Sequence, residues 1–325
     1  MAIEPHALLA ALSADRTLSG AELARRLGVT RAAVWKQMEQ LRELGAPIEA
    51  AAGRGYRLAW PLELLDTGRI RDGLGAATRK RLQTLAVHWQ IDSTSTELQR
   101  RAAAGSDMIE VCLAETQTAG RGRRGRAWQS PLGGNLYFSL LRHFEAGMAA
   151  LSGLSLVAGI AVVDALADCG VAGVGLKWPN DVLVDGRKLA GILVELGGEF
   201  LGPCHAVIGI GINLRLPPQA RARIDQPAID VAALGGEMPS RNRLAACLIE
   251  RLVAALDRFE MQGFAASVEA YARHDLLRDR PVRVLATGSA HDGVAAGVDA
   301  RGALIVRHGK TVTHYDSAEV SVRAT

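Results

Sequence analysis

Four arginines and three glycines are interleaved in residues 120–126, within the sequence ETQTAGRGRRGRAW of residues 115–128. The planar guanidinium group matches a carboxylate or a phosphate in two-point contact, and glycine lets backbone N–H groups approach a ligand closely. Because like charges this close repel one another, the segment suits either solvent or a site where an anion offsets the charge. The residue types therefore predict a cationic loop that either binds nucleic acid nonspecifically or closes over a small anion or nucleotide.

The loop is expected to connect two strands. The apolar run IEVCLA, residues 109–114, precedes it, with Gln117 near its base, and residues 135–141 form the strand expected to follow. A third expected strand, residues 87–91, ends in the hydroxyl-rich run DSTST at 92–96. Such a run can provide a helix N-cap or supply donors and acceptors to a polar ring, and the spacing leaves both interpretations open.

A second stretch that can carry chemistry is VGLKWPNDVLVDGRKLAGILVEL, residues 174–196. The pattern predicts a strand carrying Lys177, then a break, then a hairpin whose turn is Asp185-Gly186. The chain has only five lysines, and both Lys177 and Lys188 lie in this stretch. A lysine is a compact point charge that suits a phosphate or a developing negative charge. Solvated surface lysines are the simpler interpretation.

Residues 207–214, VIGIGINL, place two glycines inside an apolar strand. The GIG core resembles half of a dinucleotide fingerprint but lacks the third glycine and the following helix, so a Rossmann site is a poor interpretation. Glycines inside a strand more often indicate that something flat lies against the backbone. Asn213 at the strand end is a candidate polar contact, and the long polar segment 215–240 is a candidate lid.

The first 60 residues predict a helix-turn-helix followed by a wing. Ser19 begins a capping box, Gly28 makes the turn, and Thr30 caps a second helix over 31–44. Glycines and basic residues in 51–58 favour a β-hairpin wing. The candidate DNA contacts, early in the second helix and at the wing tip, are Thr30, Arg31, Ala32, Trp35, Lys36 and Arg54.

An αα-hairpin used for packing or dimerisation is the alternative for this module. Its eight Lys and Arg against six Asp and Glu leave a net charge of only +2. One copy should therefore bind DNA weakly, and a dimer that contacts two half-sites is expected.

From residue 280 onward the pattern changes to short strands separated by glycine-containing turns. It predicts a small antiparallel β-barrel without catalytic residues, in a supporting or partner-docking role. With 325 residues the chain is long for one domain, since about 150 residues per domain is usual. We expect three domains, with boundaries at 1–62, 63–274 and 275–325.

Composition excludes several classes of protein. The net charge of +4 is compatible with contact to a polyanion without demanding it. Four widely separated cysteines indicate a reduced, cytoplasmic protein with neither a disulfide framework nor a zinc site, and no dedicated metal site is expected from the histidines. The N-terminus lacks the pattern of a signal peptide. The uncharged run 146–163 favours a buried core helix over a membrane span, so no membrane contact is expected.

An ordered set of motifs runs through the chain. It comprises DSTS (92–95), ETQTAGRGRRGRAW (115–128), GGNLYFS (133–139), KWPNDVLV (177–184), RKLAGILVEL (187–196) and GIGIN (209–213). In this order the motifs resemble those of biotin–protein ligases. With a helix-turn-helix ahead and a β-rich segment behind, essentially the whole chain is similar to the bifunctional form, which is both a biotin operon repressor and a biotin–[acetyl-CoA-carboxylase] ligase.

The resemblance implies an α+β fold with a winged helix-turn-helix, a central mixed α/β ligase domain like that of class II aminoacyl-tRNA synthetases and biotin ligases, and a C-terminal small SH3-like β-barrel. It also implies a two-step reaction. Biotin and ATP, with Mg²⁺ bound to the phosphates of ATP rather than in a protein site, give biotinyl-5′-AMP and pyrophosphate. A lysine of the biotin carboxyl carrier protein then takes the biotinyl group, and AMP leaves.

A biotin-responsive repressor is implied as well, which binds operator DNA as a ligand-promoted homodimer. There are two alternatives: a lipoate-type ligase, and a biotin-sensing transcription factor without ligase activity. The hydroxyl-rich run favours a ureido ring over a dithiolane, and the charged residues of the loop and hairpin argue against a purely sensory role.

The resemblance also assigns residues. Lys177 and Arg123 are expected to be catalytic, with Lys177 stabilising charge in the transition state and Arg123 binding the carboxylate. Biotin is expected to contact Ser93, Thr94, Ser95, Gln117, Arg121, Gly122, Arg123 and Lys177. The adenylate and its phosphate are expected to contact Gly120, Arg121, Arg124, Arg126, Trp128, Lys188 and Asn213. The chain departs from the family in carrying Ser95 where an asparagine is usual, and in lacking a large aromatic residue in 215–240.

Overall fold

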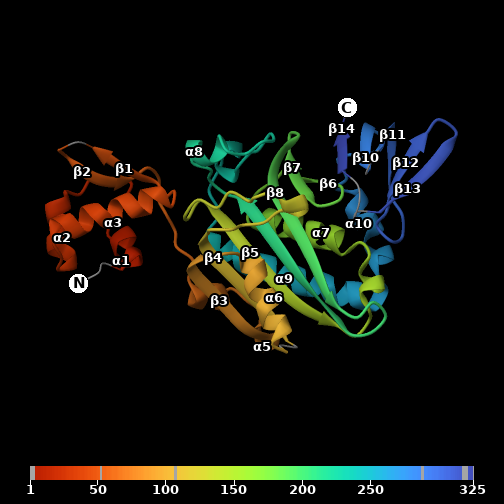
Figure 1. Ribbon diagram of the computed structural model, residues 1–325, viewed down its shortest axis with the longest axis horizontal. Coiled ribbons are helices and arrows are strands. Elements are labelled where there is room, and N and C mark those ends of the chain that lie inside the picture. Colours follow the sequence, from red (N-terminus) through yellow and green to blue (C-terminus); the bar gives the residue numbers. More distant parts are fainter. Residues whose placement is uncertain (1–3, 52, 106–107, 287–288, 317–320, 325) are drawn as a thin grey trace.

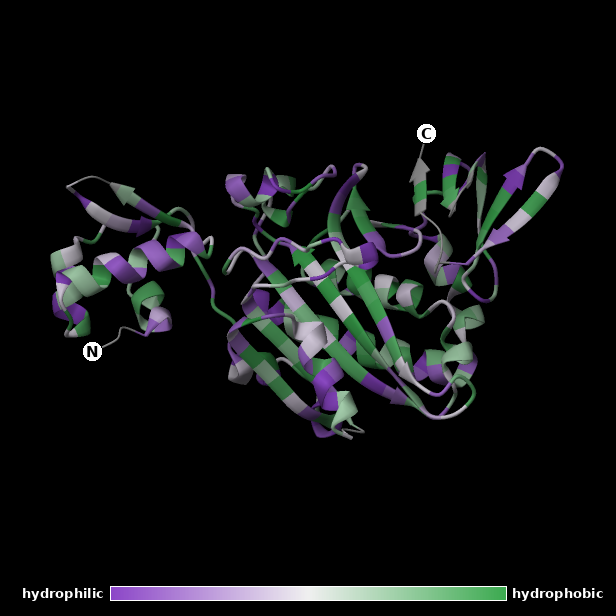
Figure 2. Ribbon diagram, viewed as in Figure 1, coloured by the Kyte–Doolittle hydropathy of each residue, from purple (hydrophilic) through white to green (hydrophobic). Residues whose placement is uncertain are grey.

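The computed structural model describes residues 4–51, 53–105, 108–286, 289–316 and 321–324. Along its longest axis lie an N-terminal helical module, a large central sheet with helices, and a smaller sheet at the C-terminal end (Figure 1). Apolar residues run along the strands of the central sheet, whereas they alternate with polar residues on the helices of the N-terminal module (Figure 2). The main core therefore surrounds the central sheet.

The N-terminal module consists of three helices followed by a two-stranded hairpin. Its elements are α1 (Pro5–Ala10), α2 (Gly20–Leu27), α3 (Arg31–Glu43), β1 (Ile48–Ala51) and β2 (Gly55–Leu58). The Ser19 hydroxyl accepts a hydrogen bond from the backbone N–H of Glu22, and the Thr30 hydroxyl accepts one from that of Ala33. Gly28 between α2 and α3 has a φ of 65°, a left-handed conformation that favours glycine. The predicted helix-turn-helix is confirmed, and a hairpin follows it at the place predicted for the wing.

A seven-stranded sheet forms the centre of the molecule, in the order β3-β4-β5-β9-β8-β7-β6. Its strands are β3 (Leu82–Ile91), β4 (Ile109–Gln117), β5 (Asn135–Phe144), β6 (Gly175–Lys177), β7 (Asp181–Val184), β8 (Arg187–Gly198) and β9 (Cys204–Asn213). The strands β3 and β4 are parallel, with α6 (Thr94–Ala103) between them in the chain, and the other neighbours are antiparallel. This topology confirms the expected mixed α/β domain.

Successive strand residues point to opposite sides of the sheet, so both of its faces carry apolar residues. Helices cover both faces. On one face α6 closes a small apolar cluster consisting of Leu98, Ala102, Cys112, Leu141 and Val207. On the other face lie α7 (Leu154–Asp168) and α9 (Arg241–Gln262), whose buried residues share the main core with the strands. Most of the uncharged run 146–163 falls in α7, a core helix as predicted. Within the ranges that the structure describes, no helix is long and apolar enough to cross a membrane.

A five-stranded antiparallel sheet ends the chain, in the order β13-β12-β11-β10-β14. Its strands are β10 (Pro281–Ala286), β11 (Ser289–Val298), β12 (Leu304–His308), β13 (Thr311–Tyr315) and β14 (Ser321–Ala324). Val282 and Val284 are buried in the main core, and Trp178 donates its Nε1–H to the carbonyl of Gly302 at 3.1 Å, so this sheet packs against the central domain. In the part of the chain that the structure describes, β13 and β14 do not pair with each other. The small antiparallel β-unit is confirmed, and the SH3-like barrel stays a prediction.

Shorter helical segments connect these units. They are α4 (Thr67–Asp72), α5 (Ala76–Arg81), α8 (Pro218–Arg221), α10 (Val268–Ala272) and the 3₁₀ turns η1 (Arg123–Gly125), η2 (Met148–Leu151), η3 (Val231–Leu234) and η4 (Phe264–Ser267). The turn η1 lies in the arginine-rich loop, and α8 and η3 lie in the long segment predicted as a lid.

Candidate active site

A cavity lies on the central sheet where the arginine-rich loop, the start of α6, and the strands β8 and β9 meet. Most of the predicted site residues line it: Ser93, Thr94, Ser95, Gln117, Arg121, Gly122, Arg123, Arg126, Trp128, Lys188 and Asn213. Gly120, Arg124 and Lys177 are not among its lining residues. The motifs that are separated in the sequence therefore meet at one place in the fold.

A cluster of hydroxyl groups forms one wall of the cavity. Ser93 caps α6 through its side chain. Thr94 Oγ1 lies 2.8 Å from Ser139 Oγ, and Ser95 Oγ lies 3.0 Å from the same atom. Gln117 Oε1 accepts a hydrogen bond from the backbone N–H of Thr94 at 2.9 Å. The N-cap interpretation of the hydroxyl-rich run is therefore confirmed for Ser93, and the supply of donors and acceptors to a polar ring stays a prediction.

Among the residues of the site that are missing from the sequence-predicted set are Ser139 and Asn180. Ser139 of β5 is fully buried, and a hydroxyl inside an otherwise apolar strand is the signal that marks it, because buried hydroxyls need partners. Asn180 lines the cavity, and its Nδ2 donates to the carbonyl of Ile192 at 2.8 Å. Its position in the strand-breaking KWPND motif is the corresponding signal.

The glycines of β9 leave room for the indole of Trp128. A Cβ added at Gly211 would lie 2.3 Å from Trp128 Cε2, and one added at Gly209 would lie 2.4 Å from Ser95 Oγ. Any side chain at either position would displace a wall of the cavity. The flat group that lies against this backbone is thus a ring of the chain itself.

The arginine-rich loop folds back on itself through its backbone. The N–H of Gly122 donates to the carbonyl of Arg126 at 2.7 Å, and the N–H of Trp128 donates to that of Gly120 at 2.9 Å. Arg124 has a φ of 59° in the turn η1, and it is exposed. Gly120 and Arg124 therefore belong to the turn that shapes the loop, while their neighbours line the cavity.

Three arginines of this loop line the cavity, namely Arg121, Arg123 and Arg126. Arg123 Nη1 donates to Asn180 Oδ1 at 3.2 Å, and Arg121 Nη2 lies 2.8 Å from Glu195 Oε2. Burial lowers the pKa of Arg123, and the charge of Arg124 lowers it further. A partly buried guanidinium beside further cations is an environment in which an incoming anion is strongly stabilised.

Lys188, rather than Lys177, is the lysine of the cavity. Lys188 is only 8% exposed, and its Nζ lies 2.6 Å from Asp181 Oδ1 and 5.7 Å from the centre of the Trp128 ring. Lys177 ends the edge strand β6, where it is paired with Asp181 in register. The register between β7 and β8 shifts after Val182, so strand alternation alone does not reveal which lysine faces a ligand. The catalytic role of Lys177 stays a prediction, and Lys188 is a second candidate for it.

The segment 215–240 covers another side of the cavity. The residues that it contributes to the lining are Arg223, Ile224, Asp225, Gln226 and Ala228. Asn213 holds this segment, because its Nδ2 donates to the carbonyls of Lys188 at 3.3 Å and Ile229 at 3.2 Å. The N–H of Lys188 also donates to the carbonyl of Pro227 at 2.9 Å. Without an aromatic marker, the sequence pattern does not single out the lining residues of this segment.

The candidate DNA contacts lie on the solvent side of the N-terminal module. All of them are exposed, namely Thr30, Arg31, Ala32, Trp35, Lys36 and Arg54. Trp35 is 60% exposed, a large fraction for this side chain. The opposite side of α3, with Val34, Met38 and Leu41, is fully buried. The helix therefore presents one solvent-facing side that nothing in the described chain covers.

Comparison with known proteins gives matches along the whole chain. Residues 87–213 match the Biotin/lipoate A/B protein ligase family, and residues 6–57 match an HTH domain. The Bifunctional ligase/repressor BirA of Salmonella typhimurium is 38% identical over 320 residues, which cover 98% of this chain and 98% of the relative. The Biotin--[acetyl-CoA-carboxylase] ligase of Mycobacterium tuberculosis is 36% identical over 248 residues, 74% of this chain and 89% of the relative.

Solved structures agree with this result. The biotin protein ligase from Aquifex aeolicus, in complex with biotin and ATP, matches 75% of this chain and 100% of its own, with a TM-score of 0.63 and 26% identity. Fold and matches together define a protein ligase with a helix-turn-helix module ahead of it. Within that class, the chain belongs to the family of bifunctional ligase/repressors.

Proposed function

We propose that this chain activates biotin with ATP to biotinyl-5′-AMP, transfers the biotinyl group to a lysine of the biotin carboxyl carrier protein of acetyl-CoA carboxylase, and represses transcription in response to biotin. The observation that carries the proposal is the cavity in which a hydroxyl cluster, the arginines of the loop and a buried lysine meet. These groups match a ureido ring, a carboxylate and a phosphate. The division into domains at 1–62, 63–274 and 275–325 is part of the same proposal.

The hydroxyl cluster binds the ureido ring of biotin. Thr94, Ser95 and Gln117 supply donors and acceptors, and Ser93 holds the start of α6 in place. A ureido ring has N–H groups and a carbonyl that all need partners when they leave water. Ser95 is shorter than the asparagine usual in the family, and its hydroxyl lies 3.0 Å from that of Ser139, so these two hydroxyls together supply the contact.

The cationic loop binds the carboxylate of biotin and the α-phosphate of ATP. Arg123, Arg121 and the backbone of Gly122 bring these two anions together, and fixed cations offset their repulsion and align them. A carboxylate oxygen attacks the α-phosphorus, the bond to the bridging oxygen of the β-phosphate breaks, and pyrophosphate leaves. Arg121 first has to leave Glu195. Because the Arg121 side chain is 40% exposed, breaking this ion pair costs little.

Lys188 stabilises the negative charge that develops on the phosphoryl group in this step. Its ammonium group is nearly buried and is already oriented by Asp181 and by the face of Trp128, so little reorganisation is required. Lys177 lies at the end of the edge strand β6, outside the lining of the cavity.

The nucleotide lies on the side of the cavity formed by the lid. Arg126, Trp128 and Asn213 line this side together with 223–226 and Ala228. Gly120 and Arg124 act through the shape of the loop, since a Cβ at Gly120 would lie 2.8 Å from the carbonyl oxygen of Trp128.

Mg²⁺ is carried by the phosphates of ATP. Across the described ranges, no group of three or more His, Cys, Asp or Glu side chains could hold a metal ion. Mg²⁺ commonly keeps several waters and binds substrate phosphates with few protein ligands, so this proposal requires no metal site built by the protein.

In the second step the amine of the acceptor lysine attacks the acyl carbon of biotinyl-5′-AMP. The bond between that carbon and the phosphate oxygen breaks, and AMP leaves. Until the acceptor arrives, the loop and the lid keep water away from the mixed anhydride.

The N-terminal module binds operator DNA through the exposed side of α3, in a homodimer that the ligand promotes. Arg31 and Lys36 contact phosphates or base edges in the major groove, and Arg54 contacts the backbone. The module has a net charge of only +2 (residues 1–60), so two copies are needed for firm binding. Sedimentation with and without biotin plus ATP, followed by an operator mobility shift, tests this part. A chain that stays monomeric with ligand contradicts it.

Biotin transfer to an acceptor lysine in the presence of Mg-ATP tests the ligase part. The expected result is biotin-dependent release of pyrophosphate and biotinylation of the carrier protein, with neither product when lipoate replaces biotin. Activity with lipoate but not with biotin would establish a lipoate-type ligase. Biotin binding without pyrophosphate release would establish a biotin-sensing transcription factor that lacks ligase activity.

A further inference from the structure

Leu132 lies in the loop between the arginine-rich segment and β5, yet its side chain belongs to the core of the N-terminal module. It has no exposed surface, and the other buried members of this core all lie between Leu8 and Leu58. Its N–H donates to the carbonyl of Leu44 at 2.9 Å, at the C-terminal end of α3. The central domain therefore completes the core of the module.

The two units approach each other closely around this residue. A Cβ added at Gly45, which has a φ of +86°, would lie 2.9 Å from Pro131 Cβ. On the other side of Leu132, a Cβ added at Gly133 would lie 2.5 Å from Leu62 Cδ1. Contacts this tight leave the loop and the end of α3 little room to move independently.

The same loop is hydrogen-bonded to the wall of the cavity. Gln117 Nε2 donates to Ser130 Oγ at 3.2 Å, and Thr116 Oγ1 donates to the carbonyl of Ser130 at 2.7 Å. Gln117 in turn accepts from the N–H of Thr94 at 2.9 Å. A short chain of contacts therefore runs from Thr94 in the cavity, through Gln117 and Ser130, to Leu132 in the module.

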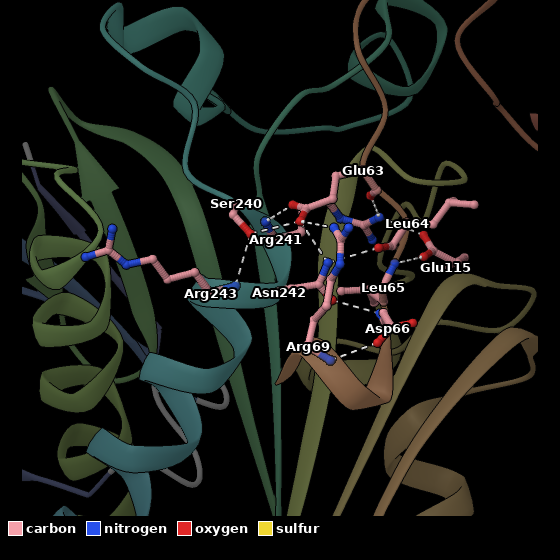
Figure 3. A network of polar contacts seen from close by, with 10 residues as sticks. All are labelled: Glu63, Leu64, Leu65, Asp66, Arg69, Glu115, Ser240, Arg241, Asn242 and Arg243. Carbon is pink, nitrogen blue, oxygen red and sulfur yellow. Dashed lines mark hydrogen bonds and ion pairs between the residues drawn. The ribbon is translucent and has the colours of Figure 1, made fainter. Parts of the chain in front are cut away.

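A second attachment joins the module to the central domain. It ends at Glu115 on β4, the strand that also carries Thr116 and Gln117. Figure 3 shows the connecting segment, with Glu63 and Leu65, held by Arg241 and Glu115. Arg241 Nη1 lies 2.7 Å from Glu115 Oε2, with side chains only 6% and 2% exposed, and the N–H of Leu65 donates to Glu115 Oε1 at 2.5 Å. Because a buried ion pair is costly to break, this attachment holds the connecting segment firmly on the central domain. Its Glu115 also accepts, through its backbone carbonyl, from the N–H of Gly133 at 3.1 Å.

We propose that Leu132 is a positioning residue that couples occupancy of the hydroxyl cluster to the order of the N-terminal module. A ligand with a ureido group that binds Thr94 and Gln117 restrains Ser130, and through it the Leu132 side chain that completes the core beneath α3. Coupling between two sites is reciprocal. Opening of the module therefore weakens ligand binding by the same factor by which the ligand suppresses opening. The proposal rests on the proposed function only in taking biotin as the ligand.

A purely structural role for Leu132 makes a different prediction. In that case Leu132 is one core residue among several, and the connecting segment alone carries any influence of the ligand. Leu23 provides the matched control, since it is also fully buried in this core but comes from α2 of the module itself. Alanine at either position leaves a cavity in the same core, whereas only Leu132→Ala removes a side chain that the loop contributes to this core.

Hydrogen exchange of the amides of α2 and α3 in the full-length chain, with and without biotin and in the absence of ATP, tests the coupling. Biotin is expected to slow exchange in the wild type and in Leu23→Ala by about fivefold, the low end of typical coupling. In Leu132→Ala, exchange is faster and no longer responds to biotin, and the dissociation constant of biotin rises by about the same factor. The dissociation constant in Leu23→Ala stays close to the wild-type value.

Persistence of the biotin response in Leu132→Ala, or its absence in the wild type that binds biotin, overturns the coupling and leaves the proposed function intact. Failure of the wild type to bind biotin in calorimetry overturns the proposed function, and the coupling to biotin with it. If Leu132→Ala leaves the module unfolded, Ser130→Ala decides, because it keeps the core and removes the hydroxyl next to Gln117. Loss of the biotin response in Ser130→Ala with unchanged exchange in the absence of ligand supports the coupling, and retention of the response rejects it.

Discussion

At the scale of single residues, Lys177 of β6 and Lys188 of β8 lead to opposite expectations for catalysis. Lys188→Gln is expected to lower the rate of adenylate formation by about 10²-fold or more, because it removes a preorganised charge from the transition state while still providing a donor to Asp181. Lys177 lies outside the lining of the cavity. Lys177→Gln is therefore expected to change the rate by less than about tenfold, which is a smaller loss than removal of a preorganised donor causes. Biotin-dependent exchange between pyrophosphate and ATP measures both. The opposite order of effects would return the role to Lys177.

Neighbouring arginines of the loop differ in the same way. Arg123→Gly is expected to speed dissociation of biotinyl-5′-AMP by about tenfold or more, since a charge-assisted hydrogen bond contributes roughly 1.5–3 kcal/mol. Arg124→Gly is the control, because Arg124 is exposed and its φ of 59° suits glycine. Stopped-flow chase of labelled adenylate gives both dissociation rates. Equal rates in the two variants would show that the loop does not retain the adenylate through Arg123.

At the scale of elements, β9 and the arginine-rich loop are matched to each other through Gly211 and Trp128. Gly211→Ala is expected to push the indole out of place, because its Cβ would lie 2.3 Å from the ring, and to weaken biotin binding by about tenfold or more, within the cost range of overpacking. Trp128→Leu in the same chain relieves the clash. The double variant is therefore expected to lose less stability than the two single losses added together. Additive losses in urea unfolding would mean that the two residues do not meet in solution.

The packing of α7 on α9 brings together two cysteines that are far apart in the sequence. Burial, and next the nearby thiol of Cys247, raise the pKa of Cys169 from its usual 9.0 to about 12. The unfolded chain therefore loses this proton first, and the contribution of the thiol to stability, complete below pH 9, is lost as pH rises toward 12. Alkylation of Cys169 by iodoacetamide, followed by peptide mass spectrometry, is expected still to rise about tenfold per pH unit at pH 10. A plateau near pH 9 in the folded chain, as expected in urea, would contradict the raised pKa.

The sequence predicts elements better than it predicts contacts between them. The caps at Ser19 and Thr30 are visible because a cap depends on residues only three positions apart. Lys188 cannot be separated from Lys177 without knowing the irregular register of β7 and β8. Leu132 looks like an ordinary loop residue, and only the tertiary fold places it in the core of another unit. Local patterns thus locate the site, and the long-range packing decides which of its neighbours face the ligand.

At the scale of the whole molecule, the N-terminal module, the central sheet and α9 are joined through one buried ion pair. Arg241 pairs with Glu115, and both also hold the segment that leads from the module (Figure 3). The start of α9 therefore acts as the common support of the linker and of the strand that carries Gln117. A change at this pair should affect the stability of the chain and the attachment of the module together.

Glu115→Ala is expected to destabilise the chain by about 3–5 kcal/mol, because it leaves the Arg241 guanidinium buried without its partner. The surface pair of Arg283 and Asp292, with side chains 51% and 63% exposed, is the control, and Asp292→Ala should leave the free energy of unfolding nearly unchanged because solvent screens an exposed pair. Urea unfolding measures both.

Replacing Glu115 and Arg241 together by leucine and methionine should recover much of the loss but not the hydrogen bond that Leu65 donates to Glu115. Limited proteolysis of the connecting segment is therefore expected to be faster in the stabilised double variant than in the wild type. Equally slow cleavage would show that its remaining contacts, such as those of Glu63 with Ser240 and Asn242, hold it in place.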